Sequence, residues 1–176
     1  IGQDMVKSGR VAAGLLAPYI TGAEVLVVTG NREFTAHGLR VRGFLDRIHE
    51  IFGGTVNAQV IESVEQYELT YDGVMHHLRS NPRLRGIYMA NESVRGCMDA
   101  LERAHPARKV HVVCHDLTPH ARQYLEDGRL DFIIDQDFSA QTTRAIEVLA
   151  HTLRTGEPPR QGIEYIHTSI ITRELL

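Results

Sequence analysis

Polar residues follow four of the short apolar runs in this sequence, and their types suit the binding of hydroxyl groups. They are Thr29–Arg32, Ala90–Glu92, His115–Thr118 and Asp135–Asp137. A carboxylate accepts several hydrogen bonds, Asn and Gln both donate and accept, and Arg donates a fork of N–H groups. Recognition of a sugar or a similar polyol requires this mixture of donors and acceptors.

These residues come together only if the apolar runs before them are neighbouring strands of one sheet. We expect strands at Glu24–Thr29, Val56–Ile61, Gly86–Ala90, Lys109–Cys114, Asp131–Asp135 and Gly162–His167. We expect helices at Met5–Ile20, Thr35–Phe52, Val64–Arg79, Ser93–His105, Pro119–Asp127 and Ser139–Thr155. Nearly continuous apolar strands are typical of burial on both faces, and strand–helix alternation indicates parallel crossovers. The sequence therefore predicts an α/β fold, with a parallel sheet and helices on both faces, whose ligand lies beyond the carboxyl ends of the strands.

Helix capping is the alternative interpretation of the same residues. Asn91, Asp116 and Thr118 each stand just before a predicted helix, where such side chains commonly accept hydrogen bonds from backbone N–H groups. The arrival of several polar residues at one sheet edge favours a binding site. Two further local signals are a predicted capping box at Ser63–Gln66 and a linker-like break at Gly156–Pro159.

Length and composition describe one domain with a packed core. The chain has 176 residues, of which 43% are hydrophobic, and 22 acidic against 19 basic residues give a net charge of −3. This balance excludes a basic nucleic-acid-binding surface on this stretch, although not a DNA-binding module on a longer chain. Cys97 and Cys114 are expected as small core residues in a reducing compartment, with a single disulfide as the alternative. With no secretory signal visible, the expected localisation is cytoplasmic.

Other kinds of chemistry lack the residues that they need. The sequence contains no phosphate-binding glycine loop, no dinucleotide fingerprint and no nucleophile elbow. His76 and His77 are adjacent on a helix and point apart, and His111 and His115 lack further ligands at metal-site spacing, so no metal or cofactor is expected. An enzyme on this sheet is disfavoured because nothing supplies a nucleophile with an oriented base.

Several segments, taken in order along the chain, carry a resemblance to a known family. They are Ile1–Leu15, Val25–Gly30 with Arg40–Phe44, Gly86–Leu101, Val110–Pro119, Ile133–Asp137 and Ile171–Leu175. As an ordered set they resemble the effector-binding domains of lactose-repressor-like (LacI/GalR) transcriptional regulators and their relatives, the type I periplasmic sugar-binding proteins. The resemblance covers the whole chain, and its specificity comes from the order of the motifs.

The resemblance implies a two-lobed domain that holds a small molecule between its lobes and closes by a hinge motion. Residues 1–135 would form the second, C-terminal lobe, on a flavodoxin-like sheet. Residues 136–167 would be a crossover, a helix and a strand of the first lobe, and residues 168–176 a C-terminal return segment. Helix Ser139–Thr155 would then expose Ile146, Leu149 and Leu153, which we expect to pack unusually on this lobe or on another chain.

The resemblance also places residues at the ligand. Arg40 would fork onto ring or hydroxyl oxygens, Asn91 and Asp116 would bridge neighbouring hydroxyls, and Gln136 would couple the ligand to the hinge. His115 departs from the family, which usually has an aromatic residue there. The implied dimer surface includes Arg95, Asp99, Thr118 and Arg122, for which a solvated helix face is an equally good interpretation.

Two functions follow from this resemblance. The leading one is the effector-binding and dimer-forming part of a LacI-type regulator, which would contact DNA through a headpiece absent from this chain. The alternative is a periplasmic sugar-binding protein of an ABC transporter. The ending Thr172–Glu174 and the unpaired cysteines favour the regulator. The expected partners are a sugar or polyol-like molecule, DNA through the headpiece and a second copy of the chain, with no membrane partner.

Overall fold

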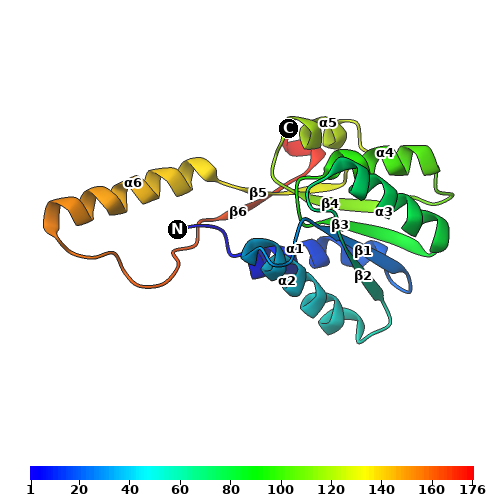
Figure 1. The fold of residues 1–176 in the computed structure, drawn as a ribbon, viewed down its shortest axis with the longest axis horizontal. Helices are drawn as coiled ribbons and strands as arrows, with labels where there is room; N and C mark the ends of the chain where they lie inside the picture. Colours follow the sequence, from blue (N-terminus) through cyan, green and yellow to red (C-terminus); the bar gives the residue numbers. More distant parts are fainter.

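A computed structural model describes all 176 residues and shows a six-stranded sheet flanked by helices (Figure 1). The strands are β1 (Glu24–Thr29), β2 (Asn57–Glu62), β3 (Leu84–Met89), β4 (His111–His115), β5 (Phe132–Gln136) and β6 (Thr168–Ile171). The helices are α1 (Met5–Leu16), α2 (Thr35–Phe52), α3 (Tyr67–Ser80), α4 (Val94–Ala104), α5 (Pro119–Glu126) and α6 (Phe138–Thr155), with short 3₁₀ turns at Ala17–Tyr19 and Arg173–Leu175. None of the helices has the length and apolar character of a membrane span.

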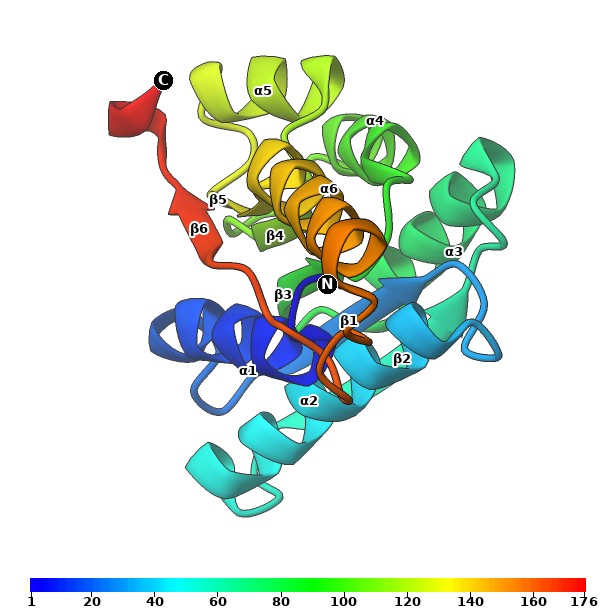
Figure 2. The same cartoon turned by 90° about the vertical axis from the view of Figure 1, so that its left-hand side faces the viewer.

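The sheet has helices on both faces, which explains why its strands are apolar at successive positions. In β1, Val25 and Val27 belong to the core under α1 and α2, whereas Leu26 and Val28 belong to the core under α3, α4 and α5. Figure 2 shows these two sets of helices on opposite sides of the sheet. Because each fully buried apolar side chain contributes about 1.5–3 kcal/mol, both faces stabilise the domain.

The strand order β2-β1-β3-β4-β5-β6 creates the place where a ligand can bind. The chain leaves β1 through α2 toward β2, then crosses back through α3 to β3 on the other side of β1. Val28 lies beside Ile61 of β2 and Met89 of β3, so these three strands end level. Neighbouring strands whose connections lead to opposite faces leave a crevice beyond their carboxyl ends.

The predicted α/β fold class is confirmed, and five of the six expected strands lie within two residues of their predicted positions. β1 to β5 are parallel as expected, but β6 runs antiparallel to β5, so the sheet is mixed. The predicted strand Gly162–His167 is wrong: this segment contains only an isolated bridge between Tyr165 and Gly2. The strand that pairs with the open edge of β5 is the next segment, Thr168–Ile171.

The predicted capping box at Ser63–Gln66 is also wrong. Val64 and Glu65 have φ values of 49° and 58°, in the left-handed region, so α3 begins only at Tyr67. Ser63 is fully buried and donates its hydroxyl to the carbonyl oxygen of Thr29 at 3.3 Å instead of capping the helix. A buried hydroxyl needs a hydrogen-bond partner, and Ser63 finds it on β1, so the local sequence preference for a helix start at Ser63 is not realised.

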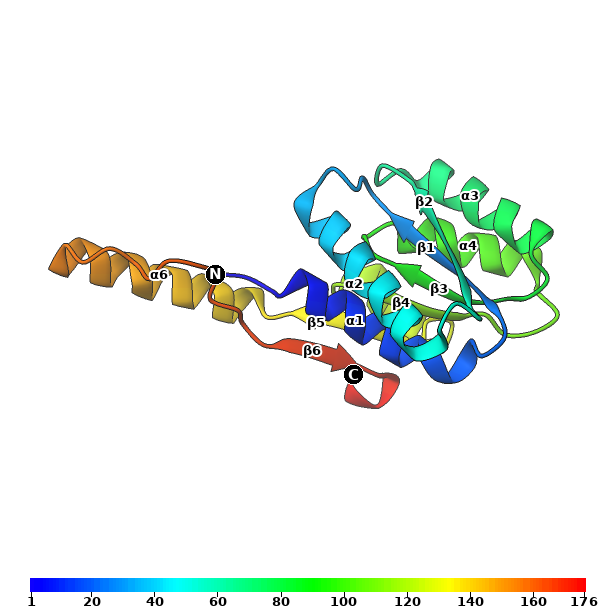
Figure 3. The same ribbon diagram turned by 90° about the horizontal axis from the view of Figure 1, so that it is seen from below.

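α6 projects away from the sheet and contacts neither face of it (Figures 1 and 3). None of its residues is buried, and Ile146 and Leu153 are 62% and 77% exposed. Arg144 pairs with Glu164 at 2.7 Å, which ties the helix to the returning chain. The expected exposure of this apolar face is therefore observed, and the suggestion that the helix packs on this lobe is wrong.

Candidate functional site

Beyond the carboxyl ends of β1, β3, β4 and β5 lies a hollow of about 500 Å³ that is open to solvent on one side. All four residues that the sequence assigns to ligand contact line it. Arg40 comes from α2, Asn91 follows β3, Asp116 follows β4, and Gln136 ends β5. The other lining residues are Met5, Ala36, His37, Glu65, Glu92 and Ser93. Because only Met5 and Ala36 are apolar, the wall suits a hydroxylated ligand better than an apolar one.

Arg40 is a buried cation with only neutral partners. Its side chain donates to the carbonyl oxygen of Ala90 and to Oε1 of Gln3, both at 3.3 Å, and its Nε has no partner. The residue is 5% exposed. A buried charge is costly unless further hydrogen bonds satisfy it, so Arg40 retains capacity to donate to a molecule in the hollow.

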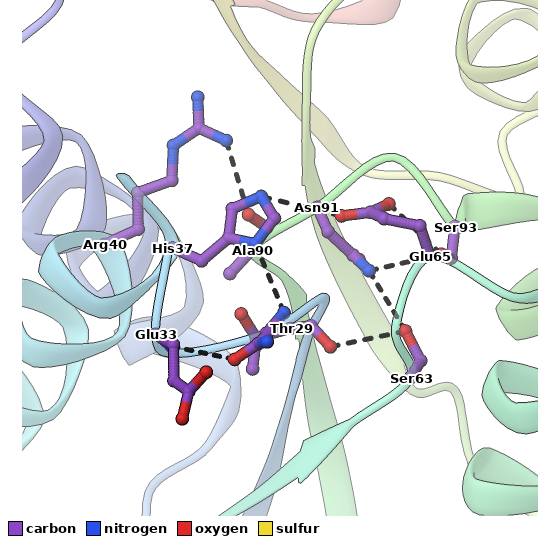
Figure 4. A network of polar contacts seen from close by, with 10 residues as sticks. Thr29, Glu33, His37, Arg40, Ser63, Glu65, Ala90, Asn91 and Ser93 are labelled. Atoms are coloured by element: carbon purple, nitrogen blue, oxygen red, sulfur yellow. Dashed lines mark hydrogen bonds and ion pairs between the residues drawn. The ribbon is translucent and has the colours of Figure 1, made fainter. Parts of the chain in front are cut away.

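Asn91 is 2% exposed and stands at the centre of a network of polar contacts, which Figure 4 shows. Its amide donates to the hydroxyl oxygens of Ser63 and Ser93, each at 3.1 Å. Ser63 donates in turn to the carbonyl oxygen of Thr29, and this chain of bonds joins the end of β1 to the loops after β2 and β3. Because both amide protons are used, Asn91 has only its Oδ1 to offer, and that atom is buried without a partner.

Glu65 and His37 line the same hollow and were not predicted from the sequence. His37 Nδ1 accepts a hydrogen bond from the Asn31 backbone N–H at 3.3 Å. A neutral ring with this acceptor carries its proton on Nε2, which lies 3.5 Å from a carboxylate oxygen of Glu65. Ser93 donates to the other oxygen of Glu65 at 3.5 Å. Figure 4 shows the Glu65 carboxylate between these two partners.

The sequence positions of these two residues become informative only when the fold is known. His37 precedes Arg40 by three positions on α2, so the two share one helix face. Glu65 was assigned to a helical first turn, whereas the left-handed backbone turns it toward β1. Gly30 makes room for it, because a Cβ at that position would overlap the Glu65 carboxylate and the His37 ring.

Asp116 and Gln136 form a pair across the ends of β4 and β5. Gln136 Nε2 donates to Oδ1 of Asp116 at 2.9 Å. The Asp116 backbone has φ 65°, and its N–H donates to the carbonyl oxygen of Ile134 at 3.0 Å. This left-handed residue turns the chain out of the sheet and leaves the carboxylate at the hollow, beside the start of the crossover to α6.

The capping alternative holds for one of the three residues to which it applied. Thr118 accepts a hydrogen bond from the Ala121 N–H at 3.2 Å and therefore caps α5. Asn91 and Asp116 cap no helix; their side chains bond to the serines and to Gln136 respectively. The two residues left for ligand contact are thus free of a local structural role as caps.

His115 does not line the hollow. Its ring is buried, with Nε2 at 2.7 Å from the Tyr88 hydroxyl, and its Nδ1 has no partner. Burial lowers the pKa of His115 well below its usual value, and the nearby Arg40 charge lowers it further. The departure from the family pattern at this position therefore changes the core beneath the site.

The four candidate dimer residues lie on the α4 and α5 side of the molecule. Asp99 accepts from the Tyr67 hydroxyl at 2.8 Å, Arg95 lies over the Tyr67 ring, and Arg122 pairs with Glu126 at 3.0 Å. Arg95 and Thr118 also line a smaller hollow of about 300 Å³, which shares Glu65, Glu92 and Ser93 with the first. A role of these residues in dimerisation stays a prediction.

Several solved structures that share the fold of this chain are sugar- or solute-binding proteins. An ABC transporter periplasmic solute-binding protein from Actinobacillus succinogenes with bound D-allose matches with a TM-score of 0.86 and 24% identity over 99% of this chain. GanP, a glucose-galactose binding protein from Geobacillus stearothermophilus, matches with 0.85 and 22% over 98%. AraP, an arabinose-binding protein from the same organism, matches with 0.85 and 16% over 98%. The chain spans about 61% of the first two and 62% of the third.

These matches correct the leading interpretation of the sequence. The prediction of a LacI-type transcriptional regulator is wrong, because the matched structures bind sugars or solutes and favour the alternative, a sugar-binding protein of a transporter. A search of curated protein sequences gives no match. The model of the periplasmic binding protein domain matches residues 1–158, nine-tenths of the chain. On this ground the chain belongs to the family of periplasmic binding protein domains.

Proposed function

We propose that this protein is a periplasmic sugar-binding protein that serves an ABC transporter, and that its ligand is a sugar or a similar polyol. The observation that carries the proposal is the convergence of Arg40, Asn91, Asp116 and Gln136 on one polar hollow. Two of their buried atoms, Arg40 Nε and Asn91 Oδ1, have no partner within the protein. Buried polar atoms are normally paired, so these two mark where ligand atoms bind.

The four residues divide the recognition of a polyol between them. Arg40 donates to ring or hydroxyl oxygens, and its charge strengthens those hydrogen bonds. Asn91 Oδ1 and the Asp116 carboxylate accept from hydroxyl protons. Gln136 holds Asp116 in place and begins the segment that leads to α6.

The position of Gln136 also links binding to the rest of the domain. We assign residues 1–135 to one lobe, and the crossover, α6 and the following segment up to residue 167 to the other. Residues 168–176 return to the first of these through β6. A ligand that contacts Gln136 then favours one arrangement of the two lobes over another, as hinge closure requires.

The two cysteines do not oppose a periplasmic location. Cys97 and Cys114 are free and fully buried in the core under α3, α4 and α5, and burial raises the pKa of both thiols. A buried thiol that stays protonated reacts slowly with disulfides, so a reducing compartment is not needed to keep these residues reduced.

The proposal is tested by ligand-dependent thermal stability with a panel of sugars and polyols. A molecule that binds only the native state raises the melting temperature by mass action. We expect at least one hexose or pentose to do so, and Asp116→Asn to abolish the increase. Asn suits the left-handed backbone at this position, and its Oδ1 accepts the bond from Gln136 as before, so the variant removes the charge and replaces the second acceptor oxygen by an NH₂ donor.

Asp72→Asn is the matched control, because Asp72 is exposed on α3 and does not line the hollow. It should respond to the sugar like the wild type. Asn91→Ala should also abolish the response, but with a loss of stability of about 1–3 kcal/mol, since it removes both donors from the buried serine network. An unchanged response of Asp116→Asn would show that the sugar binds elsewhere.

A further inference from the structure

We infer that the hollow selects hydroxylated ligands that carry a cationic amino group, and that Glu65 is the residue that selects for it. This inference rests on the proposed function, because it defines the ligand class of the same hollow. It concerns a residue that lies outside the four positions carried over from the family resemblance.

The charge of the hollow is the first reason. Its lining includes three carboxylates, from Glu65, Glu92 and Asp116, against the single guanidinium of Arg40. Among these acidic groups and Arg40, the wall has two more negative than positive charges. A concave surface lined mainly by one sign of charge raises the local concentration of ligands of the other sign.

The second reason is the surplus of hydrogen-bond acceptors. Asn91 donates both of its amide protons to serine hydroxyls. It can therefore offer only Oδ1 to a ligand, and this atom is buried and unpartnered. Asp116 uses one oxygen for Gln136, and both contacts of Glu65 are long, at 3.5 Å each. A ligand must bring donors to these oxygens. A primary ammonium group brings three N–H donors, and a carboxylate binds a charged donor more strongly than a neutral hydroxyl.

The third reason is that several separate features hold Glu65 at the hollow. The left-handed backbone at Val64 and Glu65 turns this segment out of the α3 helix. Gly30 leaves space that a Cβ would close, and His37 and Ser93 each contact one carboxylate oxygen. Strained backbone persists where the surrounding structure specifies it, and such positions cluster at binding sites.

The experiment compares amino sugars with their neutral counterparts by chemical-shift titration of the isotope-labelled protein at about pH 6.5, where primary amines are protonated. The probes are D-glucosamine, D-glucose and N-acetyl-D-glucosamine, together with the corresponding galactose series. The N-acetyl sugars keep the nitrogen at the same carbon but convert it to an uncharged amide, and the neutral hexoses control for the added bulk of the acetyl group. The variants are Glu65→Gln, Glu65→Asp and the control Glu68→Gln, whose side chain is exposed in the first turn of α3.

We expect the wild type to bind at least one amino sugar roughly tenfold more tightly than both neutral counterparts, the size of one charge-assisted hydrogen bond. Glu65→Gln should remove this preference, and an unchanged circular-dichroism spectrum and melting temperature without ligand would show that the variant is folded. Glu65→Asp should keep the preference, and Glu68→Gln should match the wild type.

Two outcomes would overturn the inference alone: neutral sugars that bind the wild type as tightly as the amino sugars do, or a preference that survives in Glu65→Gln. Either would leave the proposed function standing, because a sugar still binds. If neither series binds while another sugar or polyol raises the melting temperature, the inference fails alone, and if no sugar or polyol does so, the proposed function fails with it.

Discussion

Arg40 and Asn91 each have a hydrogen-bonding atom that no other residue of the protein satisfies. Each is almost fully buried, and each keeps one polar atom without a partner inside the protein. In a core position such an atom would cost about 1–3 kcal/mol. Here both lie at a polar hollow, so the same atoms that cost stability are the ones that a ligand can satisfy.

The buried pair of Tyr88 and His115 lies under this site and makes the domain sensitive to acid. His115 is neutral in the folded protein because burial lowers its pKa well below its usual value. In the unfolded chain its pKa is near 6.5, so between that pH and the folded pKa the unfolded state binds a proton that the native state does not. Stability from this residue therefore rises with pH and is lost as the pH falls below about 6.5.

We predict that the free energy of unfolding decreases as the pH is lowered from about 7 to about 5. The contribution of His115 to this decrease is at most about 1.4 kcal/mol per pH unit. The double variant Tyr88→Phe/His115→Phe removes both members of the hydrogen bond and should be less sensitive over this range. Urea denaturation at the two pH values measures the difference. Equal pH sensitivity in wild type and double variant would contradict the assignment to His115.

At the scale of elements, the site depends on the close packing of α1 against α2. Gly9 of α1 and Gly43 of α2 lie where the two helices meet. A Cβ at Gly43 would overlap the carbonyl oxygen of Val6, and one at Gly9 would overlap that of Arg40. Because α2 also carries His37 and Arg40, this backbone contact sets how far both residues reach into the hollow.

We predict that Gly43→Ala lowers the free energy of unfolding by about 1–3 kcal/mol or more, since backbone atoms must move to admit the methyl group. It should also weaken sugar binding by displacing α2. Gly14→Ala is the control on α1, because a Cβ there has no atom within 4 Å. That variant should be more stable by about 0.5–1 kcal/mol, as Ala favours helix over Gly.

Chemical denaturation followed by circular dichroism checks both glycine variants, and a sugar titration checks the second effect. A Gly43→Ala protein as stable as the wild type would show that the two helices separate at no cost. In that case their contact could not be what positions Arg40.

At the scale of the whole molecule, the structure consists of a packed sheet domain and a projecting segment. The two cores account for the buried apolar residues of β1 to β5 and α1 to α5, whereas α6 buries none. The ion pair between Arg144 and Glu164 links α6 to the returning segment, and the bridge between Tyr165 and Gly2 links that segment to the N-terminus. Exposed ion pairs of this kind contribute little, typically below about 1 kcal/mol.

We predict that the backbone amides of α6 exchange with solvent orders of magnitude faster than those of β3 and β4. Local opening costs little where no apolar surface is buried, and approaches the global free energy of unfolding in a packed core. Hydrogen exchange followed by mass spectrometry resolves the two segments. Protection of residues 138–155 at the level of β3 would mean that this helix packs against another molecule in solution.

The sequence by itself determined the α/β class, five of the strands and the four residues that meet at the hollow. The strands, Asn91, Asp116 and Gln136 depend on local signals: apolar runs buried on both faces, and polar residues placed directly at strand ends. Arg40 lies on α2, and the family resemblance placed it at the ligand. Tertiary structure decided the rest. Glu65 enters the site because contacts with Gly30, His37 and Ser93 accompany a left-handed turn that local helix signals do not predict. Thr168–Ile171 is the final strand because strand pairing is chosen by the open edge of β5, far away in the sequence, and not by the β propensity of Gly162–His167.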